Sequence, residues 1–285
     1  MKVIDAHIHF SNIEIFKETA KKKSNVDYSR IGLNQEFSNS NIIAGIGMGL
    51  TETNAGRFPD RESQNPMLLD LDELPKDLYE CIGINPYELI NNKIFELRNL
   101  EQSISSERVV GIKIYAGYYH YHVWDEVYDD VYKLAEKYKL PVVIHSGDTY
   151  SEKGLLKYSH PLEIDELAMK YRNVNFIVAH FGDPWIMETA ELISKNSNVY
   201  ADLSGLIVGN KQVVKKFSEE PLFKDHIKRG LIYANNYKKI LFGSDWPLVR
   251  IETYIEFIKE LIPKEHWDDV FYKNALKLFK NIKMD

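Results

Sequence analysis

The sequence predicts a (β/α)8 TIM barrel, an α/β fold in which eight parallel strands alternate with covering helices. Short apolar segments rich in Ile and Val recur along the 285 residues. Their ends are roughly 25–40 residues apart, which is too long for hairpins and suits strand–helix units. Eight such segments in one chain of this length match the barrel, and no low-complexity linker divides them. We therefore expect a single barrel domain over residues 1–285, with extra C-terminal helices.

Each expected strand is a short apolar segment bounded by polar or small residues. The eight strands are expected at about 2–9, 41–48, 79–84, 109–115, 141–145, 174–180, 198–204 and 239–245. Apolar residues at three- and four-residue spacing predict helices between them. Such helices are expected at about 129–139, 162–172 and 185–194, with extra helix within 211–238 and two or three closing helices within 251–281.

Composition narrows the class of protein. Hydrophobic residues make up 44% and charged residues 27%, as in ordinary soluble globular proteins. The formal charge is −6 and the lysines are scattered, so no basic stripe supports nucleic-acid binding. Cys81 is the one cysteine, which excludes an internal disulfide and a cysteine-based zinc site. No signal-peptide core or membrane-length apolar run is present, so we expect a cytoplasmic protein.

The first strand carries two histidines, His7 and His9, in the run Asp-Ala-His-Ile-His-Phe. Residues two apart in a strand point to the same side, so both rings can reach one site. Two neutral imidazoles that converge in this way suit a divalent metal ion. Alone the pattern is weak, because two ordinary polar residues at a strand end look the same.

Later strands end in the same kind of residue. Strand five ends at His145, strand six at His180, and strand eight at Asp245. In this barrel the carboxyl ends of the strands form the active-site face. A single histidine after an apolar strand is usually structural, but three such ends together with His7 and His9 favour a common site.

Strand four carries Lys113 in the run Val-Gly-Ile-Lys-Ile-Tyr. Val110, Ile112 and Ile114 alternate with it, so we expect these three to face the helices and Lys113 to face the barrel interior. A lysine there needs an anionic partner, a role at a metal site or a lowered pKa.

This ordered set resembles the amidohydrolase superfamily over nearly the whole chain. The segments Gly-Ile-Lys-Ile-Tyr, Val-Val-Ile-His-Ser-Gly, Val-Ala-His-Phe-Gly and Phe-Gly-Ser-Asp-Trp-Pro are most similar to its amidohydrolase-2 branch. That branch contains metal-dependent hydrolases, lactonases and decarboxylases such as aminocarboxymuconate semialdehyde decarboxylase. The resemblance implies the fold and the kind of site, and it leaves the reaction open.

By this resemblance, one zinc or similar divalent ion would be bound by His7, His9, His145 and Asp245. The ion would activate a water, and Asp245 would also accept its proton. His180 would be a base or hydrogen-bond donor with one metal, or a ligand of a second metal. Lys113 would be carboxylated in a two-metal site; we favour one metal and an unmodified Lys113. The resemblance also implies a homodimer or another homo-oligomer.

Several other residues are candidate substrate contacts. Arg57 and Arg61, in the polar loop after strand two, would bind a substrate carboxylate. The alternative is that they are ordinary loop arginines exposed to solvent. Tyr115 follows Lys113, and His160 is either a helix-start residue or a pocket residue. The His-x-His of His120 and His122 lies in a Tyr-rich loop that fits a lid better than a metal site.

We expect a hydrolase of a small, carboxylate-bearing amide, lactone or related ester, with a decarboxylase of a small aromatic or unsaturated acid as the alternative. A TatD-type nuclease also uses His-x-His on a barrel, but it has a glutamate on strand four, where this chain has Lys113. A metal-binding barrel without catalysis is the least favoured reading, because the ligand set is intact.

Overall fold

The computed structural model describes residues 1–283, and its eight strands form one parallel sheet in the order β1 to β8. The strands are β1 (Val3–Ile8), β2 (Ile42–Met48), β3 (Leu78–Ile84), β4 (Val109–Ile114), β5 (Val142–Ile144), β6 (Phe176–Val178), β7 (Val199–Asp202) and β8 (Ile240–Leu241). The expected barrel is confirmed. β3 begins one residue early, and the last four strands are shorter than their apolar runs because the chain leaves the sheet at their carboxyl ends.

The sheet closes between its first and last strands. Trp246 pairs with Ile8 in a parallel bridge just beyond β8. The Ala6 amide donates to the Phe242 carbonyl at 2.9 Å, and the Asp245 amide donates to the His7 carbonyl at 2.8 Å. The first and last strands therefore meet at one seam of the barrel.

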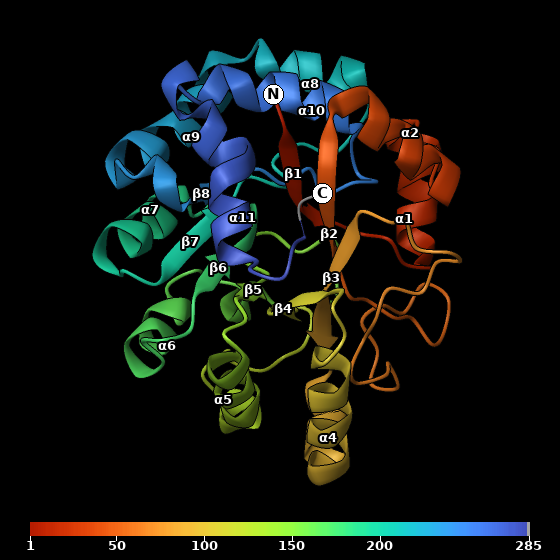
Figure 1. Ribbon diagram of the computed structural model, residues 1–285. Coiled ribbons are helices and arrows are strands. Elements are labelled where there is room, and N and C mark those ends of the chain that lie inside the picture. Colours follow the sequence, from red (N-terminus) through yellow and green to blue (C-terminus); the bar gives the residue numbers. More distant parts are fainter. Residues whose placement is uncertain (284–285) are drawn as a thin grey trace.

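Helices surround the sheet (Figure 1). They are α1 (Glu14–Thr19), α2 (Arg30–Ser40), α3 (Pro86–Asn91), α4 (Lys93–Ile104), α5 (Asp129–Tyr138), α6 (Glu163–Lys170), α7 (Ile186–Lys195), α8 (Lys211–Ser218), α9 (Pro221–Ala234), α10 (Ile251–Leu261) and α11 (Asn274–Leu278). The helices predicted from periodicity are confirmed, including the extra pair α8 and α9. Within the described chain, no helix has the length and apolar character that crossing a membrane requires.

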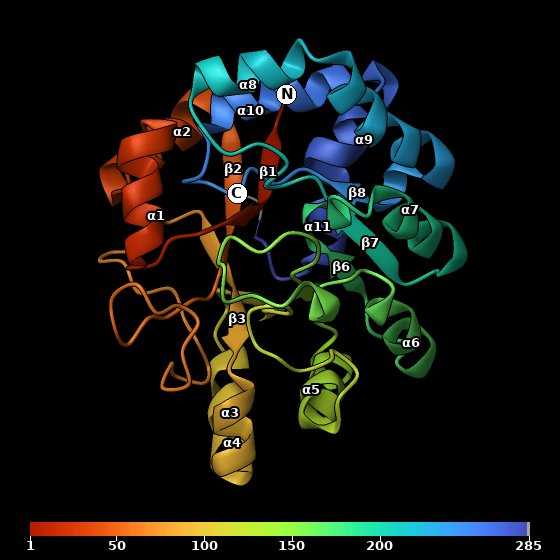
Figure 2. The same ribbon diagram turned by 180° about the vertical axis from the view of Figure 1, so that it is seen from behind.

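The connection from β2 to β3 departs from the ideal barrel. Residues 49–77 form no helix and are drawn as long orange loops beside α4 in Figure 2. Ser63 anchors this segment, because its hydroxyl donates to the Thr51 carbonyl at 2.9 Å. Asn85 also anchors it by donating from its side-chain amide to the Ser63 and Arg61 carbonyls.

One apolar layer lies outside the strands, against the helices, and another lies inside the barrel. The outer layer holds Ile112 and Ile114 together with helix residues, as predicted. Val110 instead belongs to the inner cluster, with Cys81 and Phe279 beyond α11. The prediction for Val110 was wrong because the β3–β4 register shifts between Glu80 and Cys81, and an irregularity of this kind breaks strict alternation.

Tyr254 fixes the loop that follows β7. Its hydroxyl, fully buried on α10, donates to the Leu203 carbonyl at 2.5 Å and accepts from the Leu206 amide at 3.1 Å. A buried side chain with both contacts satisfied holds its partner segment firmly. The loop from Leu203 to Leu206 therefore has one defined path at the carboxyl end of the barrel.

Candidate active site

A cavity of about 280 Å³ opens at the carboxyl ends of the strands. Its floor contains polar groups from five strands or strand ends: His9, Lys113, His145, His180 and Asp245. Its walls are mainly aromatic and aliphatic: Phe16, Phe58, Tyr115, Tyr118, Tyr150, Leu206, Val208 and Leu248. The cavity is just smaller than the usual range for small-molecule sites, which suits a small ligand.

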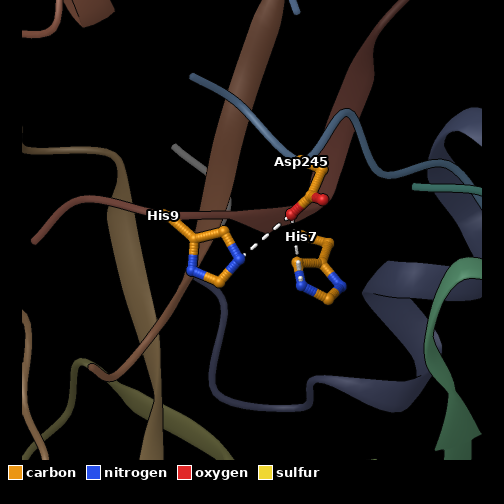
Figure 3. A group of neighbouring side chains, drawn as sticks. All are labelled: His7, His9 and Asp245. Carbon is orange, nitrogen blue, oxygen red and sulfur yellow. Dashed lines mark ion pairs between the residues drawn. The ribbon is translucent and has the colours of Figure 1, made fainter. Parts of the chain in front are cut away.

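His7, His9 and Asp245 converge at the closing seam (Figure 3). Their nitrogen and oxygen atoms lie within 4.8 Å of one another, and all three residues are buried. The His9 Nε2 atom lies 3.0 Å from Asp245 Oδ1, and His7 Nε2 lies 3.7 Å from the same oxygen. Within the described residues Asp245 Oδ1 nevertheless has no hydrogen-bond partner. The three groups therefore surround a shared space without satisfying one another.

Left-handed backbone turns direct the side chains of His180 and Asp245 towards the cavity. His180 has φ 60° and Asp245 has φ 63°, a conformation that costs a non-glycine residue roughly 1–3 kcal/mol. Hydrogen bonds hold both turns, because the His180 amide donates to Asp202 Oδ1 at 3.0 Å and the Asp245 amide donates to the His7 carbonyl. Such strain at two strand ends is typical of a functional site.

Gly205 leaves room for this arrangement. A Cβ atom there would lie 2.6 Å from His180 Nδ1 and 2.8 Å from Asp245 Oδ2. Its φ of 68° also disfavours any other residue. The glycine in the loop after β7 therefore lets the two side chains approach each other.

His145 and His180 face each other through two nitrogens that both lack a proton. His180 Nδ1 lies 3.2 Å from the Ser204 carbonyl, and His145 Nε2 lies 2.9 Å from the Asp148 carbonyl. A carbonyl only accepts, so those nitrogens carry the protons of the neutral rings. The remaining pair, His145 Nδ1 and His180 Nε2, is 3.2 Å apart. Two lone pairs this close favour a nearby cation.

Sequence reasoning missed Asp202, at the end of β7. Its Oδ2 lies 2.9 Å from His7 Nδ1, and both residues are buried. With His7 and His180 it forms a second group whose ligand atoms lie within 4.8 Å of one another. The available signal was the one that identified Asp245, a carboxylate that directly follows an apolar strand.

The charges at the floor favour a bound cation. Burial opposes the ionisation of Asp202 and Asp245, yet contacts with the surrounding histidines hold the pKa of each carboxyl well below its usual value. Burial lowers the pKa of His180 to about 4, and it also lowers the pKa of His7 below its usual value. The rings are therefore neutral at pH 7.

Lys113 supplies one positive charge to this floor. Burial lowers its pKa to about 8, while Asp202 and Asp245 act in the opposite direction. Its Nζ lies 3.4 Å from His7 Nε2 and 5.4 Å from the centre of the Tyr115 ring. One ammonium does not balance two carboxylates, and neutral imidazole and carboxylate groups are ligands that zinc accepts. The donor set therefore fits a divalent metal ion.

Other predicted contacts lie farther from the floor. Tyr115 lines the cavity, but its hydroxyl donates to the Gly49 carbonyl at 2.8 Å. Arg57 and Arg61 line a neighbouring hollow of about 530 Å³ that shares Tyr118 with the cavity. His160 is not among the cavity-lining residues; its ring packs 4.7 Å from that of Trp185, and its Nδ1 accepts from the Leu162 amide.

The histidines of the Tyr-rich loop are engaged outside the floor. His120 Nε2 donates to the Lys153 carbonyl at 3.0 Å. His122 Nδ1 lies 2.7 Å from a Glu163 carboxylate oxygen, and its ring stacks on Trp124. Neither ring reaches the groups that surround Asp245. The aromatic walls contributed by Phe16, Phe58 and Tyr150 were not predicted, because Phe16 lies on the short helix α1 and the other two lie in loops without strand or helix periodicity.

A family model described as amidohydrolase matches residues 4–280. A search of curated protein sequences found no match. Among solved structures, an uncharacterised TIM-barrel protein from Bordetella bronchiseptica is similar, with 16% identity, 99% of each chain covered and a TM-score of 0.70. A probable 2-pyrone-4,6-dicarboxylic acid hydrolase from Acinetobacter baumannii has 17% identity, 98% and 100% coverage and a TM-score of 0.65. A 2,6-dihydroxybenzoate decarboxylase from Rhizobium has 13% identity, 98% and 99% coverage and a TM-score of 0.63.

We predict that Gly205→Ala displaces the His180 and Asp245 side chains and lowers the free energy of unfolding. Gly56 provides a matched control, because its φ of 74° is similar and a Cβ there meets no atom within 4 Å. Gly56→Ala should cost about 1–2 kcal/mol from its backbone conformation alone. Gly205→Ala should cost roughly 1–3 kcal/mol more from the clash. Equal losses in urea unfolding would contradict this role for Gly205.

Proposed function

The chain belongs to the amidohydrolase family whose model covers residues 4–280, and from this premise we propose a metal-dependent hydrolase. Its substrate would be a small amide, lactone or related ester that carries a carboxylate. The convergence of His7 with His9 and Asp245, two residues that line a small cavity, supports this proposal most directly. Lys113 beside them provides the cation that a substrate carboxylate would meet.

One zinc ion per chain would be held by His7, His9, His145 and Asp245. When bound, such an ion lowers the pKa of a water towards neutrality. Two observations support this assignment: His145 Nδ1 is unprotonated, and Asp245 Oδ1 has no hydrogen-bond partner among the described residues. We favour an unmodified Lys113, since an ammonium there lies near two carboxylates and the Tyr115 ring.

The side chains have distinct roles in this proposal. Asp245 is ionised at neutral pH and accepts the proton of the attacking water. His180 lies beside Asp245, with its Nδ1 4.0 Å from Asp245 Oδ2, and its unprotonated Nε2 accepts a hydrogen bond or a proton. Lys113 holds a substrate oxygen, while Phe58 and Tyr118 pack on the substrate and exclude water.

A decarboxylase of a small aromatic acid is the second candidate. The aromatic walls of the cavity favour it, because flat rings pack well on Phe16, Phe58 and Tyr118. A screen of lactones, amides and aromatic carboxylates separates the two candidates: hydrolysis consumes water and forms an acid, whereas decarboxylation releases carbon dioxide. Zinc as the metal, a cytoplasmic location and a homo-oligomer stay predictions.

We expect purified protein to contain about one divalent ion per chain, and His7→Ala or His9→Ala to lower that occupancy. Each substitution removes an imidazole that faces the shared space beside Asp245. Elemental analysis after dialysis measures the occupancy. His266→Ala is the control, since His266 stacks on Tyr237 and does not line the cavity. Full retention of metal in a variant that combines His7→Ala and His9→Ala would refute the site.

Asp245→Asn should lower kcat by about 100-fold or more while the fold is retained, because the amide cannot accept a proton. Steady-state kinetics on the best substrate of the screen measures the loss, and circular dichroism checks the fold. Asp165→Asn is a surface control, because Asp165 pairs with Lys195 away from the cavity. A near-normal rate in Asp245→Asn would show that this carboxylate is not the base.

Arg57→Ala and Arg61→Ala should each raise KM by roughly twofold to fivefold, with little change in kcat. Exposed ion pairs contribute up to about 1 kcal/mol, and these arginines would meet the outer end of the substrate equally in ground and transition states. Arg172→Ala is the matched control, since Arg172 lines neither hollow. An unchanged KM in both arginine variants would show that neither contacts the substrate.

A further inference from the structure

We infer that Asp202 is a positioning residue that fixes the proton of His7 on Nδ1 and so keeps the Nε2 lone pair directed into the metal site. The inference rests on the metal site proposed above. It assigns a role to a residue behind the cavity rather than to one that lines it.

The first step is the hydrogen bond itself. His7 Nδ1 and Asp202 Oδ2 are 2.9 Å apart, and the exposed fractions of the two side chains are 0% and 1%. An ionised carboxylate can only accept, so His7 Nδ1 must donate. A neutral ring has one N–H group, and therefore Nε2 is bare. This atom lies 3.4 Å from Lys113 Nζ and 3.7 Å from Asp245 Oδ1, on the side of the shared space.

The second step is that Asp202 cannot turn. Its other oxygen, Oδ1, accepts from the His180 amide at 3.0 Å, the Ser204 amide at 3.0 Å and the Ser204 hydroxyl. Three donors on one oxygen keep the second oxygen directed at His7. The same carboxylate thus orients the His7 ring and holds the left-handed turn at His180.

The third step concerns the alternative that Asp202 is itself a metal ligand. His7, His180 and Asp202 do form a compact group. However, the Asp202 oxygen nearest His7 already accepts its Nδ1 proton, and its other oxygen already accepts from the His180 amide and from Ser204. Carboxylates that accept from the far nitrogen of a metal-binding histidine commonly fix its tautomer and strengthen its binding.

Asp202→Asn tests the inference because an amide has one accepting and one donating end. The three donors around Oδ1 select the amide oxygen for that side, so the NH2 group must face His7 Nδ1. Nδ1 then has to accept, and the proton moves to Nε2, where it blocks the metal. We expect zinc affinity to fall about 10- to 100-fold.

Two measurements are needed. Long-range ¹⁵N–¹H NMR on the metal-free full chain identifies which His7 nitrogen carries the proton, with the signal assigned by its loss in His7→Ala. Competition with a chromophoric chelator gives the Zn²⁺ affinity. Asp5→Asn is the matched control: Asp5 is equally buried, and its Oδ1 accepts from the His7 main-chain amide at 3.3 Å without touching the ring.

The expected result is an Nδ1–H tautomer in the wild type, an Nε2–H tautomer with weakened zinc binding in Asp202→Asn, and neither change in Asp5→Asn. A wild-type ring protonated on Nε2 overturns the inference even if no variant folds. Weakened binding with an unchanged tautomer indicates direct ligation and also overturns it, as does an equal loss in Asp5→Asn. Unaltered zinc binding in Asp202→Asn would contradict this inference but leave the proposed function standing. A wild-type protein that binds no divalent metal would contradict both.

Discussion

The hydrogen bond from the Asp245 amide to the His7 carbonyl is the contact on which the rest of the site depends. It joins the last strand end to the first and places the Asp245 carboxylate beside His7 of β1 and His9, which directly follows β1. Closing so large a loop costs entropy, which the buried strands and helices of the barrel must offset. The geometry of the candidate metal site is therefore a property of the completed barrel and not of any local segment.

The electrostatic character of the floor follows from burial. Desolvation keeps the histidines neutral, which leaves nitrogen lone pairs available, while hydrogen-bonded carboxylates stay ionised. Lys113 offsets part of the negative charge from within the same space. An environment with bare nitrogens and excess negative charge favours a cation.

Much of this arrangement could be predicted because strand alternation and strand ends are local signals. His7, His9, His145, His180 and Asp245 each follow directly from an apolar run, and Lys113 follows from alternation within β4. Val110 could not be placed, since the register shift between β3 and β4 depends on two strands at once. Arg57, Arg61 and Phe58 lie in a segment without periodicity, so their position relative to the cavity depends on tertiary contacts. Asp202 could have been found as a carboxylate at the end of an apolar strand. Its hydrogen bond to His7, which the sequence does not reveal, indicates that it positions a ring and is not itself a metal ligand.

The helix-free connection between β2 and β3 has an evolutionary consequence. Residues 49–77 contribute Phe58 to the cavity wall and Arg57 and Arg61 to the neighbouring hollow, yet none of the groups that converge on Asp245. Doubling the length of such a connection adds only about 0.6 kcal/mol of closure entropy. The segment that lines the outer cavity can therefore change in length and sequence while the groups that converge on Asp245 stay in place.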